Sequence, residues 1–479
     1  MTYEAVIGIE THVELKTRSK MFCGCSAEFG AEPNTHICPV CLGLPGSLPV
    51  PNEQAINWII AIGLALNSTI AHRSVFHRKN YFYADMPKNY QISQFDIPIC
   101  SNGHLLVDVD GEQTRIGVTR VHMEEDTGKS THIGGDGRIQ SADYTLLDFN
   151  RAGVPLVEIV SEPDLRSPAQ ARAYVQELRD IVATLDVSDA KLEEGSMRFD
   201  ANISLRPDGT DELGVKVEVK NMNSFRSLER ALSFEFDRQQ QVLDQGGQVT
   251  QETRHWDEAA GVTHSMRSKE ESSDYRYFTE PDLVPIEISD EWRERIRSAL
   301  PEMPSQRRSR YVAMGIDSAT AATVIGGGLG EILEAAVSAG GSARTVSNWL
   351  VGEVTAYLRR EGASIEDTPL TGGELAELAA LVDSGDLSST AAKAVLEGVL
   401  DGEGTPKEVA VARDLLAMKD TGALEAIVDG ILADHPDEAA RLRDGDMKVL
   451  GYLMGLVMKA TAGKADPKLA NEMLRTRAS

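Results

Sequence analysis

Acidic residues and a histidine at alternate positions near the start of the chain are the clearest candidates for chemistry. Glu10, His12 and Glu14 alternate with apolar residues over 6–15, as on a strand with one packed face and one free face. Same-face side chains on a strand are about 6–7 Å apart, so two of these residues can share one metal ion or bracket two. On spacing alone, the solvated outer face of an acidic protein explains the pattern equally well.

Further carboxylates occur in other segments, several of which also alternate. They are the run His122-Met123-Glu124-Glu125-Asp126, Glu158 within 154–161, and Asp200 with Asn202 within 197–206. Carboxylates gathered from several strands onto one sheet face repel each other unless cations neutralise them. Oxygen ligands of this kind favour Mg²⁺, which usually keeps waters and a substrate phosphate in its shell.

A basic, aromatic segment over 78–91 has the opposite charge. Its sequence is RKNYFYADMPKNYQ, in which Lys79 and Lys88 are interleaved with tyrosines. Lysines beside a magnesium site suit a nucleoside triphosphate, because charge on the phosphoryl oxygens must be offset during transfer. A patch for RNA and an ordinary surface loop are the alternative interpretations. No GxxxxGK[ST] motif occurs, so ATP is not expected in a P-loop.

Four of the five cysteines form two close pairs, Cys23-Gly24-Cys25 and Cys38-Pro39-Val40-Cys41. Two pairs separated by a short loop suit a tetrahedral Zn²⁺ site with no open position, which is a structural site. Free or disulfide-bonded cysteines are the alternative. Cys100 stands alone and is expected in the core.

The elements that must position these residues change character near residue 290. Before it, alternation over 6–15, 197–206 and 215–220 predicts strands of a largely antiparallel sheet. Helices are predicted after Ser167-Pro168 to about Leu185, and from about Ser224 to Leu243. This part of the chain is therefore expected to be α+β.

After residue 290 the strand signals vanish and short amphipathic helices are predicted. Thr405-Pro406-Lys407-Glu408 has the form of a capping box and opens a helix toward Met418. We therefore predict a domain with the zinc knuckle over 1–290, a helical domain over 291–404 and a C-terminal helical tail over 405–479.

The net charge of −26 over 479 residues argues against nucleic-acid binding by the body of the protein. Residues 447–479 carry six Lys and Arg against two acids, so this end is a basic island on an acidic chain. Neither a signal peptide nor an apolar stretch of about 20 residues is found. A soluble, cytoplasmic protein without a membrane partner is expected.

Several long, largely polar blocks resemble the signature segments of the B subunits of tRNA-dependent amidotransferases. The blocks are 9–15 (IETHVEL), 81–94, 122–129, 148–159 (DFNRAGVPLVEI), 194–206, 219–228 and 266–270 (MRSKE). The C-terminal part resembles the helical module shared with the small YqeY proteins, ending in GKADP over 463–467. Ala84 departs from the family, which often has proline there, and the stretch 250–265 looks variable.

The resemblance implies a cradle-shaped domain related to the glutamine synthetase and guanidino kinase fold, followed by a helical domain and a tail. It implies ATP-dependent conversion of Glu-tRNA(Gln) or Asp-tRNA(Asn) to Gln-tRNA(Gln) or Asn-tRNA(Asn). The implied partners are the A subunit, which is an amidase that releases ammonia from glutamine, and the small C subunit. Because the amidase nucleophile lies in the A subunit, no Ser or Cys nucleophile is expected in this chain.

A carboxylate is a poor electrophile, so we hypothesise that this chain phosphorylates the side-chain carboxylate and ammonia then displaces phosphate. The predicted Mg²⁺ ligands are Glu10, His12 and Glu125, with Glu124 and Glu158 as further acidic contributors. The candidates for binding ATP or substrate are Lys79, Tyr81, Tyr83, Lys88, Arg151, Asp200 and Asn202. Lys464 and the basic last helices are predicted to hold tRNA.

Two other functions fit parts of the pattern. A stand-alone carboxylate–ammonia ligase for a small free acid would not need the basic tail. A non-catalytic tRNA adaptor would need the tail but leaves the acidic face around Glu10, His12 and Glu125 unexplained.

Overall fold

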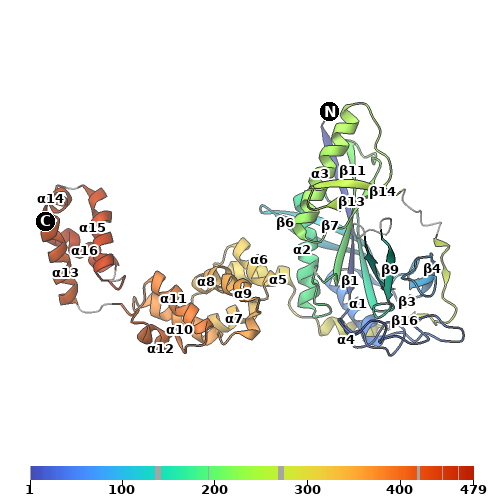
Figure 1. Cartoon of the computed structure of the whole chain (residues 1–479), viewed down its shortest axis with the longest axis horizontal. Helices are drawn as coiled ribbons and strands as arrows, with labels where there is room; N and C mark the ends of the chain where they lie inside the picture. Colours follow the sequence, from blue (N-terminus) through green and yellow to red (C-terminus); the bar gives the residue numbers. More distant parts are fainter. Residues whose placement is uncertain are drawn as a thin grey trace. The chain divides into compact units, whose positions relative to one another are not determined.

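The computed structural model describes residues 2–134, 142–192, 194–267, 275–417, 421–444, 446–461, 463–465 and 467–478. The chain divides into two compact units, Met1–Pro304 and Ser305–Ser479, which are drawn in Figure 1. The first unit is α+β and the second contains only helices among its described residues. The predicted fold class is therefore confirmed at this level.

The centre of the first unit is a nine-stranded, mostly antiparallel sheet with the order β14-β13-β12-β11-β1-β10-β7-β6-β2. In that order the strands are Val262–Arg267, Thr253–Asp257, Val217–Lys220, Met197–Pro207, Tyr3–Glu14, Pro155–Ser161, Glu112–Glu125, Cys100–Val109 and Thr69–Ile70. Among the described residues of this sheet, β12 and β13 form the one parallel pair. The strands predicted around Glu10, Glu158, Asp200 and Val219 are all present.

Strand β1 lies in the middle of the sheet, between β11 and β10, and its two faces differ. Ile7, Ile9 and Val13 are buried in the core, whereas Glu10, His12 and Glu14 alternate with them and are partly exposed. Residues paired directly across an antiparallel ladder share a face. Because Glu10 pairs with Asp200, and His12 with both Arg198 and Glu158, the polar residues of three strands share one face.

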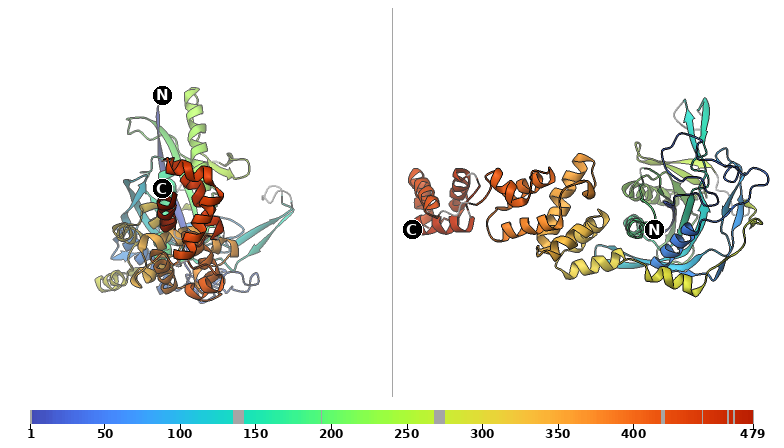
Figure 2. Two further views of the ribbon diagram at one scale, coloured as in Figure 1. Left: turned by 90° about the vertical axis from the view of Figure 1, so that its left-hand side faces the viewer. Right: turned by 90° about the horizontal axis from the view of Figure 1, so that it is seen from below.

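Three helices cover the apolar face: α1 (Glu53–Ala65), α2 (Pro168–Thr184) and α3 (Phe225–Asp244). Figure 2 shows α2 and α3 on one side of the curved sheet. The side chain of Ser167 caps α2 with Pro168 at its first turn, and Ser224 caps α3, so both predicted helices are confirmed. Helix α1 was not predicted from the sequence.

Shorter strands and one more helix complete the first unit. β15 (Phe278–Thr279), β4 (His77–Asn80) and β5 (Tyr90–Ser93) form a three-stranded sheet. β16 (Ile286–Glu287) pairs with β3 (Arg73–Ser74), and β8 (Lys129–Ile133) pairs with β9 (Tyr144–Asp148). α4 (Asp290–Ser298) contacts α1, where the indole of Trp292 donates a 2.7 Å hydrogen bond to Asn57. β5 lies against β7, and this places the basic, aromatic segment beside the sheet.

The second unit is built from short helices. They are α5 (Pro304–Ala313), α6 (Ser318–Gly326), α7 (Gly330–Ser338), α8 (Ala343–Trp349), η2 (Leu350–Val354), α9 (Thr355–Glu361), η3 (Ile365–Asp367), α10 (Gly372–Asp383), α11 (Ser389–Leu400), α12 (Pro406–Ala412), α13 (Thr421–Asp434), α14 (Pro436–Arg443), α15 (Met447–Ala460) and α16 (Pro467–Ala478). The capping box of Thr405 and Glu408 is present. The helix that it opens ends at Ala412, before the predicted end near Met418, which lies outside the described residues.

Two separate apolar clusters hold the second unit together. One runs from Tyr311 to Ala410 and the other from Leu424 to Leu474. The predicted division into 1–290, 291–404 and 405–479 stays a prediction. Within the described residues, no single helix is long and apolar enough to cross a membrane; α6 and α7 meet the criteria only as a pair bent by 116°.

Candidate active site

Two groups of metal-ligand side chains lie next to each other on the polar face of the sheet. The first group is Glu10, Asp200 and Glu218, from β1, β11 and β12. The second group, His12, Glu124 and Glu158, comes from β1, β7 and β10. In each group, the candidate ligand atoms lie within 4.8 Å of one another.

A lysine and an asparagine hold the first group. The amide of Asn202 donates a 3.0 Å hydrogen bond to Glu10, and Lys220 Nζ lies 2.5 Å from Asp200 and 3.5 Å from Glu218. Burial disfavours the charged amine, but the two carboxylates outweigh it and raise the pKa of Lys220. The ammonium thus neutralises part of a charge that a divalent cation could also neutralise.

Two histidines hold Glu158 in the second group. Glu158 Oε2 lies 3.2 Å from His122 Nε2 and 3.7 Å from His12 Nε2. Burial opposes the charged form of His122, but Glu158 and Glu124 outweigh burial and raise its pKa to about 9. Burial likewise opposes the charged form of Glu158, yet His122 lowers its pKa to about 2. The negative charge of Glu124 and Glu158 is therefore partly offset by the protonated imidazole of His122.

Glu124 connects the second group to the basic segment. It accepts hydrogen bonds from Ser93 Oγ at 2.8 Å and Gln91 Nε2 at 3.1 Å, and Lys79 Nζ lies 3.5 Å away. Burial opposes the charge on both partners, but their attraction raises the pKa of Lys79 and lowers that of Glu124. A lysine and a carboxylate group suited to a cation thus lie side by side, as phosphoryl transfer requires.

Glu125 does not join either group. Neighbouring residues of a strand point to opposite faces, and Glu125 accepts a 2.8 Å hydrogen bond from the backbone N–H of Ile92 and pairs with Lys88. Both side chains line a cavity of about 250 Å³ beside Cys23 and Cys41. The structure groups Glu10 and His12 with other carboxylates and gives Glu125 different partners, and the predicted Mg²⁺ trio of Glu10, His12 and Glu125 stays a prediction.

The predicted tyrosines lie beside Lys79. The Tyr81 hydroxyl donates a 3.2 Å hydrogen bond to Gln91, and its ring meets Tyr83 and Tyr275 edge-on. Lys79 Nζ lies 5.1 Å from the centre of the Tyr275 ring. Tyr83 is half-exposed at the edge of this aromatic group.

Arg151 belongs to a third cluster at the end of β1. Its guanidinium lies 3.7 Å from Asp126, and Arg198 makes a 2.7 Å ion pair with the same carboxylate. Burial and the nearby Asp126 raise the pKa of Glu14 to about 8, so these two carboxyl groups share one negative charge near neutral pH. The cluster presents the guanidinium groups of Arg151 and Arg198, and Arg198 pairs with His12 across β1 and β11.

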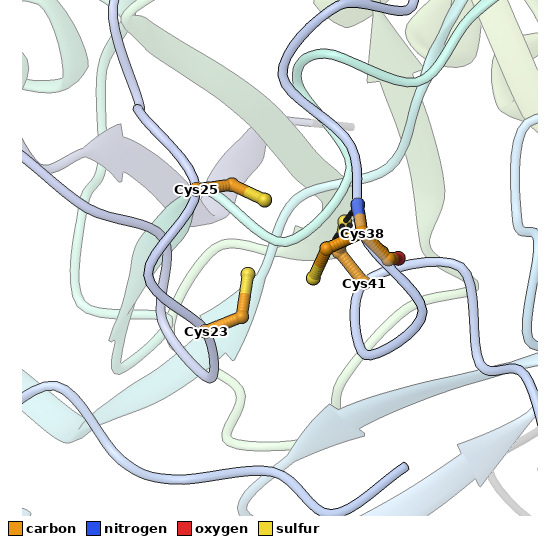
Figure 3. A group of neighbouring side chains, drawn as sticks. All are labelled: Cys23, Cys25, Cys38 and Cys41. Atoms are coloured by element: carbon orange, nitrogen blue, oxygen red, sulfur yellow. Dashed lines mark hydrogen bonds between the residues drawn. The ribbon is translucent and has the colours of Figure 1, made fainter.

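The four clustered cysteines are free thiols with sulfur atoms within 4.8 Å of one another. Cys23 and Cys25 point toward Cys38 and Cys41 from a separate loop (Figure 3). The backbone N–H of Cys38 donates a 3.1 Å hydrogen bond to Cys41 Sγ, and the Cys23 thiol lowers the pKa of Cys41 to about 5. Four convergent sulfurs, one of them already inclined to ionise, fit a tetrahedral Zn²⁺. Cys100 is buried in the core, as predicted.

Lys464 lies in the second unit, where it pairs with Asp414. In the same unit, Arg477 pairs with Glu425 and Asp429. These basic side chains of the tail therefore have acidic partners in this structure.

Comparison with known proteins decides the family. A family model described as the GatB/GatE catalytic domain matches residues 5–294, and one described as the GatB domain matches residues 331–477. The chain belongs to this family. The B subunit of the aspartyl/glutamyl-tRNA(Asn/Gln) amidotransferase of Frankia casuarinae is 51% identical to it over 99% of this chain and 95% of the relative. The B subunit of Moorella thermoacetica is 50% identical over the whole of both chains, and that of Trichodesmium erythraeum is 49% identical over 98% of this chain and 97% of the relative.

Membership of the GatB family confirms the resemblance, and the matched segments contain both carboxylate groups, the cysteine cluster and Lys464. Sequence reasoning did not assign roles to Glu218, Lys220, His122 or Arg198. A signal was available for Glu218 and Lys220, because they alternate with Val217 and Val219 on a predicted strand. The block 266–270, which resembles a signature segment of the family, lies partly outside the described residues.

Proposed function

We propose that this chain is the phosphoryl-transferring subunit of a tRNA-dependent amidotransferase. In this proposal it uses ATP to activate the side-chain carboxylate of Glu-tRNA(Gln), Asp-tRNA(Asn) or both, and ammonia then gives Gln-tRNA(Gln) or Asn-tRNA(Asn). The names of the relatives support the substrate class. The observation that supports this chemistry is the pair of neighbouring metal-ligand groups, Glu10 with Asp200 and Glu218, and His12 with Glu124 and Glu158. Lys79 lies beside Glu124 of the second group.

The two groups fit magnesium by their donor sets. Glu10, Asp200 and Glu218 offer only carboxylate oxygens, and His12, Glu124 and Glu158 offer two carboxylates and an imidazole. Hard oxygen ligands suit Mg²⁺, which leaves coordination positions for water and phosphate. When bound, Mg²⁺ neutralises phosphate oxygens and so lets two anions approach each other.

The residues of this chain then bind and orient the two reacting groups. Lys79, buried against Glu124, presents a fixed positive charge toward the γ-phosphate and offsets the charge that develops on its oxygens. Arg151 and Arg198 lie on the same face, at the end of β1, and are the candidates for binding the substrate carboxylate. The carboxylate oxygen attacks phosphorus, ADP leaves, and ammonia later displaces phosphate from the acyl carbon.

The remaining parts of the proposal concern architecture and partners. The first unit is proposed to share the fold of glutamine synthetase and the guanidino kinases, and its cysteine cluster is proposed to hold structural Zn²⁺. Residues 405–479, with Lys464, are proposed to bind tRNA as a YqeY-like tail. The proposed cytoplasmic complex also contains the amidase, which is the A subunit, together with the small C subunit. Tyr81, Tyr83 and Lys88 are proposed to lie near the reacting groups.

The test is ATP turnover by the complete complex with and without Glu-tRNA(Gln). The proposal predicts ADP formation that depends on the charged tRNA and on Mg²⁺. Turnover with free glutamate alone would favour a stand-alone ligase. Amidation without any ADP formation would favour a non-catalytic tRNA adaptor, for which the basic C-terminal region is the supporting observation.

A further inference from the structure

The loop between the two cysteine pairs is interlocked with residues 147–153, the Arg151 segment. The side chain of Asn34 accepts a 2.8 Å hydrogen bond from the backbone N–H of Phe149 and donates a 3.0 Å hydrogen bond to the carbonyl of Leu147. The backbone N–H of Asn34 donates a third, also at 3.0 Å, to the carboxylate of Asp148. One loop residue is thus joined to three successive residues of the segment.

The Arg151 segment holds the same loop in return. The side chain of Asn150 donates a 2.7 Å hydrogen bond to the carbonyl of Glu32 and accepts a 2.8 Å hydrogen bond from the backbone N–H of His36. An asparagine amide suits this exchange, because it offers an acceptor and a donor at one end of a short side chain. The two asparagines therefore fasten the loop and the segment from both sides.

The stretch that leads into the first cysteine pair contacts the segment as well. Lys20 Nζ donates a 3.2 Å hydrogen bond to the carbonyl of Phe149. The backbone N–H of Met21 donates a 2.7 Å hydrogen bond to the carbonyl of Gly153. Both stretches that precede a cysteine pair therefore hold the Arg151 segment, and the four converging sulfurs bring the two pairs together.

The segment in turn sets the position of the Arg151 guanidinium. Arg151 Nε and Nη2 donate 3.1 Å hydrogen bonds to the carbonyls of Thr127 and Gly128. A Cβ added to Gly128 would lie 2.9 Å from the ring of Phe149 and 3.0 Å from the carbonyl of Asp148, so the two backbones are in close contact. A shift of the Arg151 segment would therefore move the guanidinium, the carbonyls that it contacts, or both.

We propose that Asn34 is a positioning residue for Arg151, through which the loop between the cysteine pairs helps to orient the substrate carboxylate. This inference rests on the proposed phosphoryl transfer, in which Arg151 is a candidate for binding that carboxylate. Attack on phosphorus requires the carboxylate oxygen in a narrow range of positions, and a displacement of about 1 Å can cost about 100-fold in rate. Loss of the Asn34 contacts therefore lowers turnover more than it weakens tRNA binding, which the tail is proposed to provide.

The experiment compares Asn34→Gly with Thr35→Ala in the complete complex. The φ of Asn34 is 59°, which glycine adopts freely, so Asn34→Gly removes two side-chain hydrogen bonds without straining the backbone. Thr35 is also exposed, but its hydroxyl donates a 2.6 Å hydrogen bond within its own loop, to the carbonyl of Glu32. We expect Asn34→Gly to lower kcat for amidation of Glu-tRNA(Gln) at least about tenfold with little change in the Kd for tRNA. Thr35→Ala should leave both unchanged.

A double-mutant cycle with Arg151→Lys shows whether Asn34 acts through Arg151. Arg151→Lys keeps the positive charge but loses the planar group that contacts two carbonyls at once. Because the guanidinium is then absent, Asn34→Gly should lower kcat much less in the Arg151→Lys background than in the wild type. Equal losses in the two backgrounds would overturn the inference, because the effect of Asn34 would not pass through Arg151.

Hydrogen exchange tests the interlocked contacts without reference to activity. We expect faster amide exchange over 147–153 in Asn34→Gly and unchanged exchange in Thr35→Ala. Unchanged exchange over 147–153, or an unchanged kcat in Asn34→Gly, would contradict a positioning role. If the wild-type complex still shows tRNA-dependent ADP formation in these cases, the proposed function stands and only the role of Asn34 fails. A wild-type complex without such ADP formation would overturn the proposed function itself, and with it the role given to Asn34.

Discussion

Glu10 and His12 are two residues apart on β1, yet each lies in a different carboxylate group. Glu10 meets Asp200 because the two residues pair directly across β1 and β11, and His12 meets Glu158 across β1 and β10. One strand thus contributes a candidate ligand to each of two neighbouring groups that could hold a cation. Such an arrangement suits a reaction in which phosphate and carboxylate must both be held near positive charge.

Glu10→Gln tests this arrangement at the first group. The substitution keeps the size of the side chain and removes its negative charge, so Mg²⁺ and the phosphates bind less well. We expect ATP-dependent amidation to fall by at least about 100-fold, while glutamine hydrolysis by the amidase stays largely intact. Unchanged amidation would remove Glu10 from the mechanism. Glu112→Gln, at the start of β7 and outside both groups, is the matched control.

The substitution Glu125→Gln tests whether the ion pair of Glu125 and Lys88 is independent of the two metal-ligand groups. Glu125 and Lys88 are both nearly inaccessible, and removal of one charge leaves the other buried without its partner. We expect a loss of about 3–5 kcal/mol in the free energy of unfolding. Because Glu125 lies outside both groups, the Mg²⁺ concentration for half-maximal ADP formation should not change. We expect Glu158→Gln to raise this Mg²⁺ concentration. A similar rise in Glu125→Gln would show that Glu125 contributes to metal binding.

At the scale of elements, the alternation of the sequence predicted β1, β11 and β10, and the Ser-Pro and Ser caps predicted α2 and α3. Helix α1 was missed because residues 55–65 are almost entirely apolar and have no clear helical period. The division of the site residues into two groups could not be predicted from the sequence either, because it depends on strand order and register. Glu124 and Glu125 are equally acidic in the sequence, and only the position of β5 against β7 separates their partners.

The loops that carry the cysteines provide a test of metal binding at this scale. We expect about one zinc per chain in the purified complex, measured by elemental mass spectrometry. Cys38→Ser should lose the zinc and lower the melting temperature, because a structural site contributes folding energy. Cys100→Ala, which removes a core thiol away from the cluster, should retain the zinc. Zinc-free wild-type protein with an unchanged melting temperature would contradict the assignment.

At the scale of the whole molecule, the sheet unit contains the residues of the proposed phosphoryl transfer, and the helical unit contains the tail that is proposed to bind tRNA. A cut at 405 would remove Val409 and Ala410 from the first apolar cluster of the helical unit, whereas an end at Ala417 leaves that cluster complete. We expect a chain ending at Ala417 to lose at least about tenfold in tRNA affinity and to bind ATP normally. Equal tRNA affinity of the shortened and intact complexes would show that the tail is not the RNA contact.

The most direct test of the account follows the oxygen atoms of the substrate. Glu-tRNA(Gln) labelled with oxygen-18 in the side-chain carboxylate is amidated by the complete complex with ATP and Mg²⁺, and the released phosphate is analysed by mass spectrometry. If the carboxylate attacks the γ-phosphorus, one labelled oxygen leaves with phosphate when ammonia displaces it, and Glu10→Gln abolishes this transfer. Phosphate without label, in a complex that still forms Gln-tRNA(Gln), would contradict phosphorylation of the carboxylate.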